Sequence, residues 1–177
     1  MGVMTMEMAK AMFRYDREAG KLYWKQRPLS HFATETAWKI WNAWAPGREV
    51  GSISSGYRTF NTGGQNFSTH RVIYFLETGQ WPVEVDHDNG DGLDNRFSNL
   101  FDVSHAENMK NLPLRKSNTS GYPGVMWEKS KCLWVARIPV NGKLKTLGRS
   151  KDKNKVIAIR QRAEAELGYH VNHGRAA

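Results

Sequence analysis

The chain has 177 residues, of which 40% are hydrophobic and 11% aromatic, so one or two packed domains are expected and wholesale disorder is excluded. Its single cysteine, Cys132, excludes an internal disulfide framework and a zinc site with two thiolates, and no apolar run approaches the ~20 residues that cross a bilayer. The net charge of +9 is uneven, because residues 1–110 carry 12 basic and 13 acidic side chains whereas residues 111–177 carry 14 and 4.

The N-terminal region begins with a predicted helix over residues 5–13, capped by a threonine, and continues with a strand over residues 20–25. Beyond that strand the pattern has no clean period. Trp38, Trp41 and Trp44 are spaced three apart, which favours one face of a short helix that packs in a core over a platform for stacking bases. The sequence assigns no chemistry to this region.

A hairpin and a helix follow. Residues 57–61 and 66–69 flank Gly63-Gly64, a pair typical of a tight turn between two strands. An apolar helix is predicted over residues 70–78, and Gly79 ends it.

The next predicted unit is a strand, a polar loop, a second strand and a helix. The strands cover residues 83–87 and 100–103, and residues 88–94 form the loop. Ser104 and Glu107 match a capping box that opens the helix.

This unit carries an aspartate–histidine pair followed by two asparagines. Around them, the stretches that agree with one known pattern are His70-Arg71, Val85-Asp86-His87-Asp88-Asn89-Gly90-Asp91, Asn95-Arg96, Asn99-Leu100 and Glu107-Asn108. Residues 68–112 resemble the HNH endonuclease family, in the form common in phage and intron homing enzymes, with asparagine rather than histidine at the third position. The resemblance implies a ββα-metal fold.

The resemblance also implies a role for each residue. Asp86 and Asn108 would hold one divalent cation per active site, Mg²⁺ or Mn²⁺, through oxygen. His87 would be the general base that takes a proton from the attacking water. Asn99 would bond backbone across the loop and so belongs to the catalytic set. Arg71 precedes the motif and is expected to contact phosphate or to pack against its helix.

Two other interpretations of this unit are a structural histidine and a calcium-binding loop. An adjacent aspartate and histidine are common, and a lone histidine is more often structural than catalytic. A calcium-binding EF-hand beginning at Asp86 is excluded, because Gly90 and Phe97 stand where ligands are needed.

The last third begins after a predicted linker. Three strands are expected over residues 125–129, 133–140 and 143–149, and Asn141-Gly142 is a strong hairpin signal between the last two. A helix follows over residues 152–167, with an apolar stripe formed by Val156, Ile159 and Ala163.

Residues 118–168 resemble the AP2 DNA-binding domain, a three-stranded sheet backed by one helix, in which the sheet enters the major groove. The matching text is Ser120-Gly-Tyr-Pro-Gly-Val125, Trp134-Val-Ala-Arg-Ile138, Asn141-Gly142-Lys143 and Leu147-Gly148-Arg149. We expect Trp134 to be core. The candidate DNA contacts are Trp127, Lys129, Arg137, Lys143, Lys145 and Arg149. The alternative is a basic surface that only aids solubility.

Together these patterns predict an α+β protein, a ββα-metal HNH unit followed by a three-stranded antiparallel sheet packed on one helix. The expected divisions are residues 1–60 of unknown role, 61–112 nuclease, 113–120 linker and 121–177 AP2-like domain. The expected function is a phage- or bacterium-encoded, homing-type DNA endonuclease that nicks double-stranded DNA as a cytoplasmic monomer, without a membrane or small-molecule cofactor. The alternative is a sequence-specific DNA-binding regulator with an inactive nuclease unit.

Overall fold

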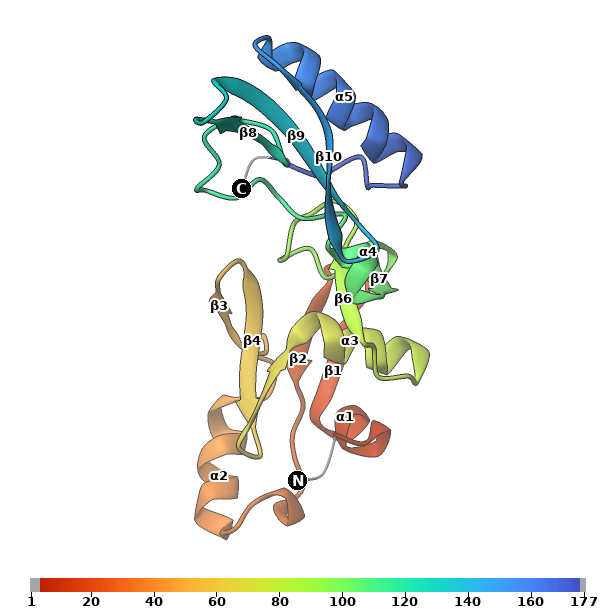
Figure 1. Ribbon diagram of the computed structural model, residues 1–177. Helices are drawn as coiled ribbons and strands as arrows, with labels where there is room; N and C mark the ends of the chain where they lie inside the picture. The colour runs from red at the N-terminus through yellow and green to blue at the C-terminus, as the bar shows by residue number, and fades with distance from the viewer. Residues whose placement is uncertain (1–3, 176–177) are drawn as a thin grey trace. The chain divides into compact units, whose positions relative to one another are not determined.

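The computed structural model describes residues 4–175 and divides into two compact units, Met1–Ser104 and His105–Ala177 (Figure 1). Both units mix helices with small antiparallel sheets, which confirms the α+β class. Among residues 4–175 we find no helix with the length and apolar character that crossing a bilayer demands.

The first unit opens with a short helix and a hairpin. Helix α1 (Met6–Met12) begins at Thr5, whose Oγ1 accepts a bond from the backbone N of Met8 at 3.2 Å. Strand β1 (Phe13–Asp16) pairs with the predicted strand β2 (Lys21–Trp24). Strand β1 was not expected from the sequence; its apolar Phe13 becomes core only because β2 lies beside it.

A helical segment and a three-stranded sheet follow. The helical elements are η1 (Leu29–His31) and α2 (Glu35–Trp44), and the sheet contains β3 (Ser52–Ser54), β4 (Tyr57–Thr62) and β5 (Gln65–Ser68). The three tryptophans lie on helix α2, but the expected core face is wrong, because α2 has no buried residue and Trp44 is 51% exposed. The β4–β5 hairpin is confirmed. The short edge strand β3 was not predicted.

The predicted helix after the hairpin is α3 (Thr69–Thr78), and Gly79 ends it with a positive φ of 78°. Strands β6 (Glu84–His87) and β7 (Leu100–Val103) then pair antiparallel, joined by the polar loop and a 3₁₀ turn, η2 (Phe97–Asn99). Because successive strand residues point to opposite faces, Asp86 and His87 leave β6 on different sides.

One hydrophobic core joins the N-terminal region to the predicted nuclease region. Met12, Phe13 and Leu22 pack in the same cluster as Ile73 of α3 and Leu100 of β7. Residues 4–60 therefore contribute to the core on which β6 and β7 rest.

The second unit begins with α4 (His105–Asn108) and contains one sheet and one long helix. The strands are β8 (Val125–Glu128), β9 (Leu133–Val140) and β10 (Lys143–Ser150), in the order β10-β9-β8, and the helix is α5 (Lys153–Glu166). Asn141 and Gly142 have φ values of 50° and 74°, which confirms the predicted tight turn.

The predicted apolar stripe of α5 is only partly right. Val156 is buried against Val125 and Ala136, but Ile159 is 38% exposed. Arg160 and Glu164 are buried instead. The helix therefore meets the sheet through an ion pair as well as through apolar contacts.

The predicted linker, 113–120, has no regular secondary structure but is bonded within the second unit. The backbone N of Leu114 donates to the carbonyl of Arg175 at 2.9 Å, and Ser120 Oγ donates to the carbonyl of Tyr122 at 2.9 Å. Both ends of this segment are thus fixed to its own unit.

Candidate active site

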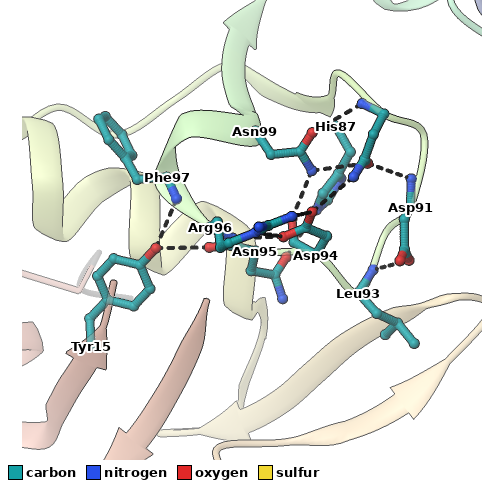
Figure 2. Close-up of polar contacts among 10 residues, drawn as sticks. Tyr15, His87, Asp91, Leu93, Asp94, Asn95, Arg96, Phe97 and Asn99 are labelled. Carbon is teal, nitrogen blue, oxygen red and sulfur yellow. Dashed lines mark hydrogen bonds and ion pairs between the residues drawn. The ribbon is translucent and has the colours of Figure 1, made fainter. Parts of the chain in front are cut away.

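The first unit holds a buried histidine at the end of β6. His87 is 3% exposed, and its Nε2 lies 2.9 Å from Oδ1 of Asn95 (Figure 2). Its backbone is fixed as well, because its carbonyl accepts a bond from the N of Gly90 at 2.8 Å. The imidazole is therefore held in one orientation by its neighbours.

Two rings cover the imidazole of His87. The ring of His70 lies 5.1 Å from it, centroid to centroid, and the ring of Tyr57 lies 5.8 Å away. His70 is buried, and its Nδ1 is sealed from water without a hydrogen-bond partner. Burial lowers the pKa of His70 to about 3, and His87 and Arg71 add to this shift. His70 is therefore an uncharged ring that packs against His87.

This burial predicts a pH dependence of stability. Between about pH 6.5 and pH 3 the unfolded chain binds a proton at His70 that the folded chain does not bind. The free energy of unfolding should therefore fall on acidification by up to about 1.4 kcal/mol per pH unit from this group. In urea titrations at pH 7.5 and pH 5, His70→Phe should show a shallower dependence than the native chain. An equal dependence in both proteins would contradict the prediction.

Asn99 holds the loop between the two strands. Its Oδ1 accepts from the N of Asn89 at 3.0 Å, and its Nδ2 donates to Oδ1 of Asn89 at 3.0 Å and to the carbonyl of Asp94 at 2.8 Å (Figure 2). Its carbonyl also accepts from the N of Asp88 at 3.1 Å. The side chain bridges the loop, as the family resemblance implied, and it does not touch His87 through any of these bonds.

The negative charge of the polar loop is partly neutralised by a neighbouring arginine. Asp94 makes a two-pronged contact with Arg96, at 2.8 Å to Nε and 2.6 Å to Nη2. This bond holds the pKa of Asp94 down to about 2. Asp91 accepts from the N of Leu93 at 2.9 Å. These carboxylates therefore fix the loop through bonds to residues within or next to it.

The two residues expected to hold a cation lie on different units. Asp86 is on β6 of the first unit, and Asn108 ends α4 of the second. Within residues 4–175, no three His, Cys, Asp or Glu side chains gather as metal ligands would. Carboxylate and amide oxygens are the ligand types that Mg²⁺ prefers in proteins, where it keeps several of its waters.

Arg71 is engaged inside the first unit. Its Nη2 donates to the carbonyl of Pro82 at 2.9 Å, and its guanidinium lies 5.7 Å from the ring centroid of Trp81. These contacts indicate that Arg71 packs within the first unit rather than contacting a DNA phosphate.

The candidate DNA contacts of the second unit lie on two faces of its sheet. Directly paired residues of antiparallel strands share a face, and Trp127 pairs with Trp134 while Lys145 pairs with Ile138. Trp134 packs with Val156 of α5, so this is the helix side. By the same register, Lys143 lies on the helix side of the sheet, whereas Arg137 and Arg149 lie on the opposite side. Lys129 is exposed in the turn between β8 and β9.

The two arginines on the open face share one acidic partner. Glu128 Oε2 accepts from Nε of Arg149 at 2.8 Å, and its Oε1 lies 3.8 Å from Nη2 of Arg137. Arg137 also lines a cavity of about 390 Å³, together with Leu144 and Arg115. This face therefore carries two basic side chains whose charge is partly neutralised by Glu128.

Sequence reasoning assigned no chemistry to three residues around His87. His70 and Asn95 stood in the stretches that carried the resemblance, and nothing in their spacing showed that both would contact His87. Tyr57 lies outside those stretches, and no sequence signal could have placed it there.

Comparisons with known proteins concern the same part of the chain. A model of the HNH endonuclease family matches residues 67–110. Protein 3.8 of Escherichia phage T7 is 34% identical over 101 residues, which cover 55% of this chain and 83% of that relative. No solved structure matches the chain.

Proposed function

We propose that this chain, which carries an HNH endonuclease domain and belongs to the same family as Protein 3.8 of Escherichia phage T7, is a metal-dependent DNA endonuclease. The observation that carries the proposal is the buried, oriented imidazole of His87 inside the segment that matches the HNH endonuclease family, residues 67–110.

The proposed reaction is hydrolysis of a phosphodiester bond. His87 takes a proton from water, the water oxygen bonds to phosphorus, and the bond from phosphorus to the 3′-oxygen breaks. Asn99 keeps the loop in place while this happens, because it bonds both sides of it.

Asp86 and Asn108 would hold the cation, Mg²⁺ or Mn²⁺, one ion per site. When bound, such an ion supplies positive charge to the phosphate and to the departing 3′-oxygen. One active site per monomer makes nicking of one strand the expected product. The phage relative and the DNA substrate together support action inside a host cell.

The second unit is the proposed DNA-positioning module, with an AP2-like sheet and helix. The support is the charge of residues 111–177, with 14 basic and 4 acidic side chains, and a three-stranded sheet whose open face carries Arg137 and Arg149. We therefore place the main contact with the phosphate backbone on this open face.

Removing the acidic partner of these arginines should strengthen DNA binding. Glu128→Gln removes one negative charge from the open face, so duplex affinity is expected to rise severalfold, with a salt dependence steeper by up to about one counterion. Fluorescence anisotropy at low and moderate salt measures this, with Glu166→Gln on exposed α5 as the control. Weaker binding in Glu128→Gln would contradict the prediction.

The proposed activity is tested with supercoiled plasmid DNA. Purified protein should convert it to the relaxed form in Mg²⁺ or Mn²⁺ and not in EDTA; phage and host genomic DNA serve as further substrates if the plasmid lacks a site. Binding without cleavage in any metal would support the competing DNA-binding regulator and overturn the enzyme.

A further inference from the structure

The structure assigns a positioning role to Asn95: its side-chain carbonyl fixes the tautomer of His87, so that Nε2 carries the proton and Nδ1 is the free base. The inference comes from a chain of hydrogen bonds inside the first unit. Its catalytic consequence rests on the proposed function, whereas the tautomer itself does not.

The chain of bonds begins on strand β4. Thr69 Oγ1 donates to the carbonyl of Arg58 at 3.1 Å, so its lone pairs face its other neighbour. Nδ2 of Asn95 lies 3.4 Å from this oxygen and donates to it. The reverse orientation of the amide would set its oxygen against a hydroxyl whose hydrogen is already used.

This orientation turns Oδ1 of Asn95 toward His87. A carbonyl oxygen only accepts, so the imidazole nitrogen 2.9 Å away must be the protonated one. Nδ1 has no hydrogen-bond partner among the described residues. It is therefore the ring nitrogen that keeps its lone pair.

The backbone of Asn95 is held by the N-terminal hairpin. Tyr15 Oη donates to the carbonyl of Asn95 at 2.9 Å and accepts from the N of Phe97 at 2.8 Å (Figure 2). Gly20, with φ of 66°, lies so close that a Cβ there would be 2.6 Å from the N of Arg96. Residues 1–60 thus hold the residue that orients the proposed base.

The test uses the full chain, metal-free, with ¹⁵N-labelled histidine, and reads the two ring nitrogens of His87 by NMR above pH 7.5. The expected signature in the native chain is a protonated Nε2 and an unprotonated Nδ1. Asn95→Asp keeps an acceptor toward Nε2, and its second oxygen accepts from Thr69 Oγ1 once that hydroxyl turns, so Nε2 should stay protonated. Asn95→Leu is similar in size but offers no hydrogen-bond acceptor, so it should give a mixture of both tautomers.

Cleavage supplies the second readout. Asn95→Leu should be slower by about 10–100-fold, with Asn95→Asp recovering most of the rate. An unchanged tautomer in Asn95→Leu, or a native chain protonated at Nδ1, overturns the inference. If Asn95→Leu does not fold, Thr69→Val, which removes the bond that orients the amide, must show the mixture instead. Tautomers that follow the prediction in a chain that never cleaves DNA would overturn only the proposed function.

Discussion

His87→Ala is expected to slow metal-dependent DNA cleavage by about 10²–10⁴-fold, the range that a positioned general base contributes. The duplex affinity should stay unchanged, because the proposed DNA contacts lie on the second unit. Plasmid relaxation measures the rate, and anisotropy measures the affinity. His31→Ala, a histidine on η1 away from the site, is the matched control.

A structural effect can be separated from a chemical one. His87 is 3% exposed, so the alanine variant leaves a cavity beside the Asn95 acceptor. Added imidazole should enter this cavity, donate its N–H to Asn95 and restore part of the rate. A variant that cleaves at the native rate would remove His87 from the mechanism, and an unfolded variant would show itself by lost near-ultraviolet dichroism.

The sequence correctly predicted turns and helix ends, because these depend on residues that are neighbours in the chain. The Asn141-Gly142 turn requires two positive φ values and has them. Helix α3 ends at Gly79, which adopts the left-handed conformation that glycine tolerates. The candidate roles of Asp86, His87 and Asn99 came from the family resemblance, which a single short stretch of chain carries.

Contacts between distant residues could not be predicted in this way. Tyr15 and Asn95 are 80 positions apart, and Thr69 and Asn95 are 26 apart. No periodicity links such residues, so the N-terminal region could be given no chemistry from the sequence. Strand β1 was missed for the same reason, since a four-residue strand exists only through its partner β2.

Helix α5 shows a different limit of prediction from sequence. Its apolar residues predicted a purely apolar stripe, but the face that meets the sheet also carries the buried Arg160 and Glu164. A charged residue is normally expected outside, and only a partner of opposite charge makes its burial tolerable. The pair is spaced by four residues, the one signal that could have indicated it.

This buried pair carries the second large prediction. Arg160 Nε lies 2.9 Å from Glu164 Oε1, with the two side chains 3% and 10% exposed. Tyr122 Oη donates to Glu164 Oε2 at 2.7 Å, and burial raises the pKa of Tyr122 to about 12, with the same carboxylate adding to the shift. Nη1 of Arg160 also donates to the carbonyl of Arg137 at 3.1 Å.

Arg160→Met is therefore expected to destabilise the second unit by about 3–5 kcal/mol, because the Glu164 carboxylate stays buried without its cation. Arg160→Met combined with Glu164→Gln should cost less, since no charge is then buried and the amide oxygen still accepts from Tyr122. Amide hydrogen exchange along β9 measures the opening of this unit separately from the first. Arg162→Met, on the exposed side of α5, is the control. A double variant less stable than the single one would show that the pair does not act through its charges.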